Sequence, residues 1–286
     1  LIPGGPEAVK VPYVMPHPPA QRVIVSYRPL ILPARATFPL DLFAVEALHG
    51  GEESGYRAIL GEKELLLARG STVFRWVHSE DCLLVEADST LYGRASAERL
   101  IRLAAGCQFE RLHAARIEFG AVGDTGGSSA HDSPGTRAAG EPAALPPVAL
   151  DRVLDVAGCR TLVRGDLRLP PHHVLAGDLV VTGGLFVGEG TRIEGSVKSY
   201  KDMVLARGAQ VQGSLVCGRS IAVGPECRLA GPVIAEREIT IETGSRLGSE
   251  ESPTTVCSPH LFLHEGVIAF GTVRAGIVGE VLGVGC

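Results

Sequence analysis

The sequence predicts an all-β fold, a three-sided β-helix (β-solenoid) with about eighteen residues in each coil. Three observations lead to this prediction. Aliphatic residues recur at that period, apolar residues within one period are separated by even numbers as in strands, and glycine recurs at fixed places between them. The chain of 286 residues is 45% hydrophobic but only 5% aromatic, and it contains 36 glycines. We therefore expect an aliphatic core interrupted by tight turns.

We expect residues 1–41 to form an extended, proline-rich arm. This segment holds nine of the 19 prolines, which resist helix, and residues 21–27 (QRVIVSY) predict one short strand within it. The arm is a candidate attachment to a membrane or a membrane protein. The chain begins at Leu1 rather than Met, which leaves room for an upstream signal or membrane segment, although no apolar window of the given chain is long enough to span a bilayer.

Residues 42–120 are predicted to form an N-terminal solenoid segment. Its frame has leucine or isoleucine in the first position of each period, apolar residues in the third and ninth, and a turn residue in the sixth. These columns are Leu65, Leu83 and Ile101; Leu67, Val85 and Leu103; Val73, Leu91 and Phe109; and Gly70, Asp88 and Gly106.

Residues 121–147, rich in Gly, Ser, Ala and Pro, predict a flexible linker, and residues 148–275 predict a second solenoid segment. The apolar tail, residues 276–286, is expected to add a strand or to seal the last coil. We expect two glycine columns to turn the corners with positive φ. The frame runs through Leu185, Met203, Ile221 and Ile239, and resumes at Leu261 after a four-residue insertion; the glycine columns are Gly190, Gly208 and Gly244, and Gly195, Gly213 and Gly231.

Short Gly-[Asp/Ser]-[Leu/Ile/Val] steps recur at 165–167, 177–179, 195–197 and 213–215, between apolar segments such as 185–193. In these steps residues 162–247 resemble the bactofilin family, also called the polymer-forming cytoskeletal domain; the N-terminal solenoid resembles it in period only. The resemblance implies a right-handed β-helix that polymerises end to end without nucleotide. It also implies a scaffold for membrane-associated structures and cell-shape enzymes, at the inner, cytoplasmic face of a bacterial membrane, with the periplasm as the alternative.

Self-assembly through coil ends is the predicted function, because an uncapped solenoid end exposes unpaired backbone and an apolar cross-section. No capping helix is evident after the last coil. We therefore expect a non-enzymatic structural protein that associates with further copies of itself through apolar residues of its terminal coils. The expected interface residues are Ile59, Leu65, Leu67, Leu261, Phe262, Leu263 and Phe270.

The alternative is an enzyme, since eighteen residues are also three hexapeptides, the period of left-handed β-helix acyltransferases and nucleotidyltransferases. The strict six-residue step fails at Ser199, Cys217 and Ala235, where an aliphatic residue is expected. The best candidate base is the pair His172 and His173, which we interpret instead as the corner of an irregular coil. His78, His113 and His264 are expected to be structural or solvent-facing, Trp76 to pack on the side of the solenoid, and Glu236 and Glu238 to pair with arginines on the solvent face.

Composition disfavours several other functions. A net charge of −5 and an isoelectric point near 6.0 disfavour nucleic-acid binding. A phosphate-binding loop of the GK[ST] type is missing, so no nucleotide is expected. The seven cysteines are never closer than ten residues apart, which disfavours a metal site, and we predict neither catalytic residues nor a cofactor. The cysteines are expected to be small buried side chains in a reducing compartment.

Overall fold

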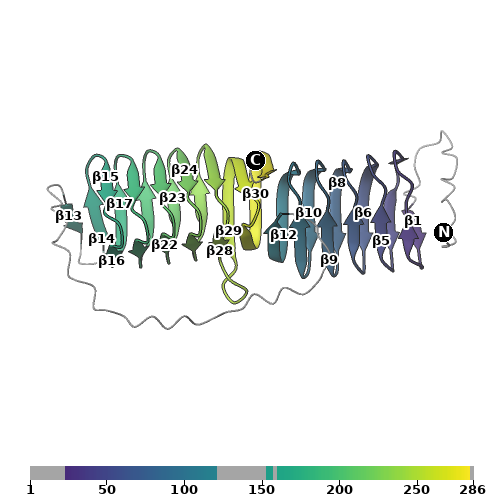
Figure 1. The fold of residues 1–286 in the computed structure, drawn as a ribbon, viewed down its shortest axis with the longest axis horizontal. Coiled ribbons are helices and arrows are strands. Elements are labelled where there is room, and N and C mark those ends of the chain that lie inside the picture. Colours follow the sequence, from purple (N-terminus) through teal and green to yellow (C-terminus); the bar gives the residue numbers. More distant parts are fainter. Residues whose placement is uncertain (1–22, 121–152, 157–159, 284–286) are drawn as a thin grey trace.

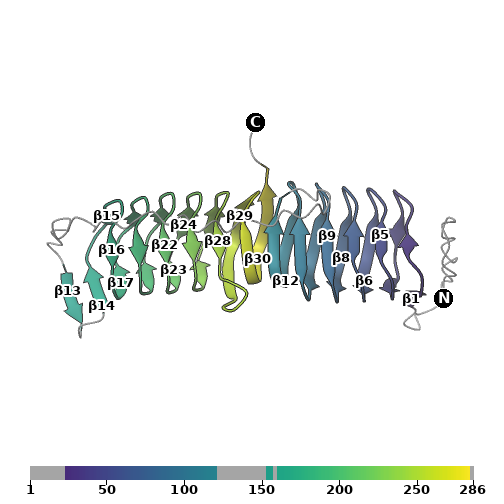
Figure 2. The same ribbon diagram turned by 60° about the horizontal axis from the view of Figure 1, so that its bottom comes forward.

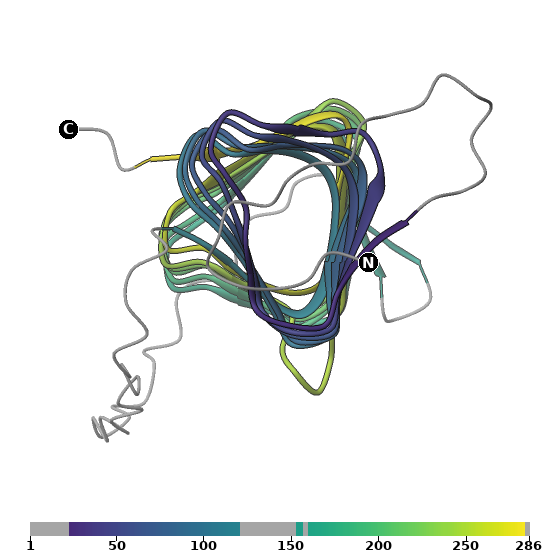
Figure 3. The same cartoon turned by 90° about the vertical axis from the view of Figure 1, so that its right-hand side faces the viewer.

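The computed structural model describes residues 23–120, 153–156 and 160–283. Every element in these ranges is a strand, and the strands wind into a β-solenoid of about 12 turns. Figure 1 shows the rod from the side, and Figure 3 shows its three-sided cross-section from the end. The predicted fold class is confirmed. Residues 1–22 of the expected arm, the expected linker at 121–147 and residues 284–286 lie outside the described residues.

Twelve strands form the N-terminal half of the rod, which runs from Val23 to the middle of the molecule (Figure 1). They are β1 (Val23–Ser26), β2 (Leu30–Ile31), β3 (Thr37–Phe38), β4 (Asp41–Ala44), β5 (Leu48–Gly50), β6 (Gly55–Gly61), β7 (Leu65–Leu67), β8 (Thr72–Ser79), β9 (Cys82–Val85), β10 (Thr90–Ala97), β11 (Leu100–Leu103) and β12 (Gln108–Phe119).

The remaining eighteen strands form the C-terminal half. They are β13 (Val153–Val156), β14 (Arg160–Val163), β15 (Leu167–Leu169), β16 (Val174–Leu175), β17 (Asp178–Val181), β18 (Leu185–Val187), β19 (Arg192–Ile193), β20 (Val197–Ser199), β21 (Met203–Leu205), β22 (Gln210–Val211), β23 (Leu215–Cys217), β24 (Ser220–Val223), β25 (Arg228–Leu229), β26 (Val233–Ala235), β27 (Glu238–Ile241), β28 (Arg246–Leu247), β29 (Thr254–His264) and β30 (Ile268–Leu282).

Each strand pairs in parallel with the equivalent strand of the next coil, so the predicted columns become ladders of stacked side chains. In the N-terminal half Leu65 pairs with Leu83, which pairs with Ile101. In the C-terminal half Ile239 pairs with Leu261 across the predicted insertion, whose residues project from one edge of the rod in Figure 3. The ladder side chains are fully buried because alternate residues of each strand point inward.

The two halves meet through their carboxyl-terminal coils. Strand β12 pairs antiparallel with β30, whereas every other described pairing is parallel except the β13–β14 hairpin. Two coil ends of the same polarity can pair only if one is turned over, and this makes their edge strands antiparallel. Both amino-terminal coils therefore lie at opposite ends of one continuous rod, as Figures 1 and 2 show. We call the β12–β30 contact the joint.

The joint also aligns the three sides of the two halves. Face 1 contains residues 111–114 of β12 and 271–274 of β30, face 2 contains 117–118 and 268–269, and face 3 contains 108–109 and 279–280. Face 1 continues outward through β10, β8, β6, β4 and β1 on one side and through β29, β26, β23, β20, β17 and β14 on the other.

The two predicted glycine columns turn corners for different reasons. Gly190, Gly208 and Gly244 have φ of 61°, 67° and 73°, as expected, in the left-handed region that side chains disfavour. Gly213 is not among the residues with positive φ. A Cβ built on Gly213 would lie 2.5 Å from the carbonyl carbon of Gly195 in the preceding coil. The second column therefore needs glycine because successive backbones approach closely, and the prediction of positive φ there is wrong.

Small polar residues fill the corners next to the turns. Ser199, at a position where a hexapeptide repeat expects an aliphatic residue, is fully buried, and its hydroxyl donates to the carbonyl oxygen of Gly183 at 2.8 Å. The Gly-[Asp/Ser] steps have a related role, because Asp178 Oδ1 accepts from the backbone N–H of Ser196 at 2.8 Å. Ser196 Oγ accepts in turn from the N–H of Ser214 at 3.2 Å. These side chains satisfy corner backbone groups that no strand partner reaches.

The solenoid begins earlier in the sequence, and ends later, than the expected bounds of residues 42 and 275. Residues 23–40 form the first coil rather than an extended arm, and Asp41 begins β4 of the second coil. Pro29, Pro33 and Pro39 lie between strands, where no ladder N–H is required. Residues 276–282 of the expected tail belong to β30, in keeping with the expectation of an added strand that seals the coil. No helix that is long and apolar enough to cross a bilayer occurs in the described ranges.

Candidate functional site

The described rod has two free strand edges, and these are its candidate functional sites. At the first end, β1, β2 and β3 each pair on one side only, with β4, β5 and β6. At the second end, β15 and β16 likewise pair only with β18 and β19, whereas β13 covers β14. Unpaired edges of this kind are templates for further strands. Within the described part of the chain the first end is therefore the more open one.

The first coil has the same aliphatic interior as the coils behind it. Ile24, Leu30, Leu32 and Phe38 are all buried, and the Phe38 ring stacks on Tyr56 of the next coil, with centroids 5.4 Å apart and planes 7° from parallel. On the outer side of β2, Ile31 is 66% exposed. An apolar cross-section that continues to the last coil is what another coil end would extend.

The second end is more polar at its corners. Asp166 Oδ1 accepts from the backbone N–H of Gly184 at 2.8 Å, and Arg160 lies 3.7 Å from Asp178. Val174, on the outer side of β16, is 60% exposed. Antiparallel pairing of β13 with β14 supplies that strand with a partner, so an added chain could extend only two of the three sides of this coil.

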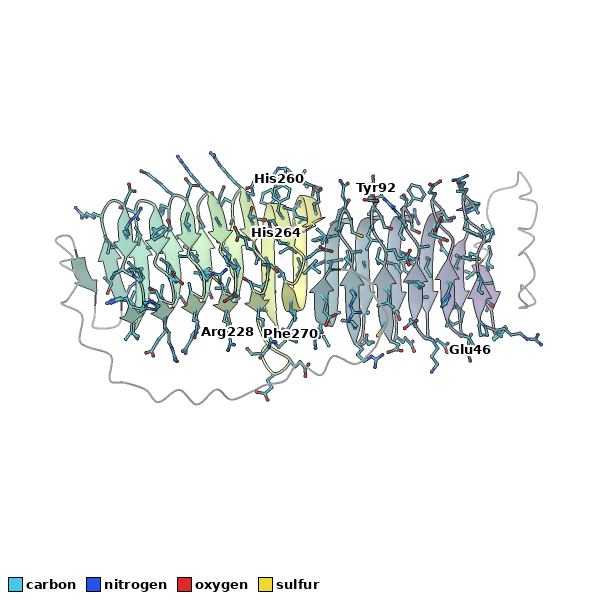
Figure 4. All side chains as sticks on the ribbon, viewed as in Figure 1. Glu46, Tyr92, Arg228, His260, His264 and Phe270 are labelled. Atoms are coloured by element: carbon cyan, nitrogen blue, oxygen red, sulfur yellow. The ribbon has the colours of Figure 1, made fainter. Side chains whose placement is uncertain are left out.

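The expected interface residues lie elsewhere. Ile59, Leu65 and Leu67 are fully buried and do not lie at an end of the rod. They belong to ladders inside the N-terminal half. Leu261 and Leu263 are fully buried in β29, and Phe262 is half-buried on the outer side of the same strand. Phe270 is 8% exposed at the joint, at the lower edge of the rod in Figure 4. For the six buried residues of this set to contact another copy, the rod would have to open.

The joint covers the last coil of the C-terminal half, for which the sequence showed no capping helix. Gly106 donates its N–H to the carbonyl oxygen of Val281 at 2.8 Å, and Val281 donates to Cys107 at 2.9 Å. On face 2 the N–H of Phe119 donates to Val267 at 3.0 Å. The eighteen-residue repeat could not predict this contact. It identifies residues that stack on the equivalent residues of the next coil, but it does not indicate which coil ends meet.

A groove of about 510 Å³ lies on face 2 beside the joint. Glu118 binds two arginines there, Arg102 at 2.5 Å and Arg116 at 2.6 Å, and the insertion residue Glu250 lines the same groove. The Arg116 Nε atom is buried without a hydrogen-bond partner. Because carboxylates already balance the arginines of this groove, we interpret the network as one that fastens the last coil of the N-terminal half.

Among the described histidines, His78 and His113 are the strand partners of Ser96 on its two sides. His172 occupies the turn position directly before Gly190 in the stack, with φ of 55°, which agrees with its interpretation as a corner residue. His78 Nδ1 lies 2.9 Å from Ser96 Oγ, and His113 Nδ1 lies 2.9 Å from Thr272 Oγ1; sequence reasoning gave neither a partner. His264 is half-buried on β29. Among the described residues no group of three His, Cys, Asp or Glu side chains is placed to hold a metal ion.

The cysteines of the described ranges are core residues, as expected. Cys82, Cys107, Cys217 and Cys227 are buried and Cys257 is half-buried, all as free thiols. Burial raises the pKa of Cys107 and of Cys227 to about 11, because it disfavours the thiolate. The Cys227 thiol donates to the carbonyl oxygen of Ala206 at 3.2 Å. These thiols therefore act as small side chains and not as nucleophiles.

We compared the chain with known protein families, curated proteins and solved structures. No family model matches the sequence, and no curated protein or solved structure is significantly similar to it. The bactofilin resemblance therefore stays a prediction that rests on the residues quoted for it.

Proposed function

We propose that this chain is a structural protein whose rods associate end to end through their amino-terminal coils, in the manner that the bactofilin resemblance implies. The observation that carries the proposal is the free edge of the first coil, where β1, β2 and β3 each have one strand partner among the described residues. An edge of three short strands around an apolar interior is a surface that strand pairing can extend.

The joint supports this mode of association, because it is an example of two coil ends joined within one chain. There an antiparallel edge pairing and a shared aliphatic interior combine in one contact. Since both free ends are amino-terminal, two rods that meet at the first end would also pair like with like and antiparallel. The result would be a pair of rods, and a filament if the second end pairs as well.

Electron microscopy and light scattering of the full chain over a concentration series test this proposal. We expect rods that are longer than one molecule and a mass that grows with concentration. Ile31→Lys should suppress growth at the first end, and Val174→Lys at the second, because a lysine on an edge strand opposes edge pairing. Val204→Lys is the matched control, since Val204 is 39% exposed on β21, two coils inward from the second end. A wild-type chain that stays monomeric at every concentration would overturn the proposal.

A further inference from the structure

Face 1 has a row of three arginines across the joint. Arg94 of β10 is the strand partner of Arg111 of β12, and Arg111 is the partner of Arg274 of β30. All three are exposed. Neighbouring strands lie about 4.8 Å apart, so three positive charges stand within about 10 Å along the rod. The partner of Arg94 on the other side is Trp76.

The side chains of these arginines are not in ion pairs. No side-chain hydrogen bond or ion pair joins Arg94, Arg111 or Arg274 to any other residue that the structure describes. The carboxylate of Glu110, which precedes Arg111, accepts instead from the backbone N–H of Gly93 at 3.0 Å. In the same coils, Arg69 and Arg99 each pair with a carboxylate at less than 3 Å. Like charges directly opposite each other on neighbouring strands are destabilising. A chain with a net charge of −5 thus concentrates unpaired positive charge at its centre.

The row belongs to a longer outward-facing column without acidic residues. From Arg274 the strand partners lead along face 1 to the far end of the C-terminal half, and each is apolar, a cysteine or a lysine. They are Cys257, Ile234, Val216, Lys198, Val180 and Leu162.

Exposed apolar side chains gather on the same side of the molecule. Phe74, Trp76 and Tyr92 are 54%, 38% and 47% exposed, although most aromatic side chains are expected inside. Tyr92 lies on the edge between faces 1 and 3, and Figure 4 shows His260 on that edge beyond the joint. Further exposed apolar residues on face 1 or this edge are Tyr200, Ile234 and Ile277.

The shape of this surface disfavours a small ligand, a stacked sugar or a stacked base as its partner. Small ligands bind in concave sites, and three grooves on the described part of the rod are lined by residues other than this row and these rings. The rings of Phe74 and Tyr92 stack on each other, with centroids 6.5 Å apart and planes 11° from parallel. Their faces are therefore turned toward one another, which makes them a poor platform for a stacked sugar or base and leaves their edges toward solvent.

We propose that face 1 of the rod binds the surface of an anionic lipid bilayer. Arginine side chains attract anionic headgroups, and Trp and Tyr rings partition to the boundary between headgroups and acyl chains. Because face 1 is a straight side of the rod, its arginines and its aromatic residues can contact a flat bilayer surface at the same time. This proposal does not depend on the association of rod ends.

Trp76 makes the proposal directly measurable, because it is the only tryptophan in the chain. The full chain is mixed with vesicles of phosphatidylcholine alone or of phosphatidylcholine and phosphatidylglycerol in equal amounts. We expect the emission of Trp76 to shift to shorter wavelength, and the protein to co-sediment, only with the anionic vesicles. Binding with an unchanged Trp76 spectrum would place the contact elsewhere and overturn the proposal.

Variants separate this face from the rest of the chain. Arg94→Gln, Arg111→Gln and Arg274→Gln together should weaken vesicle binding by about fivefold for each arginine removed. Arg228→Gln with Arg246→Gln is the matched control, since both arginines are exposed on face 2 and should leave binding unchanged. Circular dichroism confirms that each variant is folded.

Two results would contradict the assignment of a lipid surface. If the control variant loses as much binding as the face 1 variant, attraction is spread over the whole rod. If soluble inorganic polyphosphate competes fully with the vesicles and itself binds without shifting the Trp76 emission, the partner is a soluble polyanion instead.

Discussion

Gly279 of β30 lies against the ring of Phe109 of β12, and a Cβ built on Gly279 would come within 2.5 Å of Cε2 of that ring. The two residues are strand partners in the antiparallel joint, and Phe109 is buried there. The close approach lets an aromatic ring from one half of the rod fill the end of the other half. It is a contact between residues that are far apart in the sequence, and it belongs only to this arrangement of the two halves.

Gly279→Ala should therefore destabilise the joint. The added methyl group meets a ring that is enclosed by core side chains, and overpacking of this kind costs about 1–3 kcal/mol. Urea denaturation followed by circular dichroism measures the loss. Gly276→Ala in the same strand is the control, since its Cβ would meet nothing closer than 3.5 Å.

A second substitution tests whether the ring is the cause. Phe109→Leu in the Gly279→Ala background should recover part of the lost stability, although Phe109→Leu alone removes buried surface. Additive losses from the two substitutions would contradict the contact.

The two glycine columns should respond differently to alanine. Gly208→Ala costs about 1 kcal/mol, because φ of 67° is unfavourable for a side chain and the new Cβ would have no neighbour nearer than 4.0 Å. Gly213→Ala forces a Cβ into the backbone of the preceding coil and should cost about 3 kcal/mol. Thermal and urea unfolding of both variants give the order, and a larger loss for Gly208→Ala would refute the distinction.

Glu118→Gln should weaken the last coil of the N-terminal half. Glu118 binds Arg102 and Arg116 at once, and its side chain is 19% exposed. Removing its charge leaves two neighbouring arginines without a counter-charge, which we expect to cost about 1–3 kcal/mol.

Glu53→Gln is the control for Glu118→Gln, because the Arg35–Glu53 pair is 79% and 62% exposed and such pairs contribute less than about 1 kcal/mol. Equal losses of unfolding free energy in urea would show that the Glu118 network has no special role.

Stability should fall at alkaline pH through the buried thiols. Burial raises the pKa of Cys107 and Cys227 from 9.0 to about 11. An unfolded chain therefore releases these protons at lower pH than the folded chain, so the stabilisation is complete below pH 9 and is lost as the pH rises toward 11 and beyond. Urea midpoints over this range measure the slope. Cys107→Ala with Cys227→Ala should flatten it, and an unchanged slope would assign the effect to other groups.

Much of the fold could be predicted because each coil contacts mainly the next coil in the sequence and the same pattern of residues recurs in every coil. A column such as Leu185, Met203 and Ile221 is visible in the sequence, since each coil stacks on the next at a constant interval. The insertion before Leu261 was also evident, because the frame resumed after it.

The joint and the first coil could not be predicted in the same way. β12 and β30 pair across a long stretch of sequence and in the opposite direction, and no period records which coil ends meet. In the first coil, prolines at 29, 33 and 39 are corner residues that resemble those of an extended arm. The expected interface residues were assigned to exposed ends for the same reason: Phe270 lies in a terminal coil of its own half but inside the rod.

The antiparallel joint is tested most directly by a disulfide between its two faces. Arg111 and Arg274 are strand partners, so Arg111→Cys with Arg274→Cys should form a link within one chain under mild oxidation, detectable by mass spectrometry of the digest. Both this variant and its control carry Cys257→Ser, because Cys257 is the strand partner of residue 274 on its other side. Arg94→Cys with Arg274→Cys places the thiols two strands apart, about 10 Å, which is too far for a disulfide. We expect a link between residues 111 and 274 in the first variant and none between residues 94 and 274 in the second. Failure of the first pair to link, or links between chains only, would contradict it.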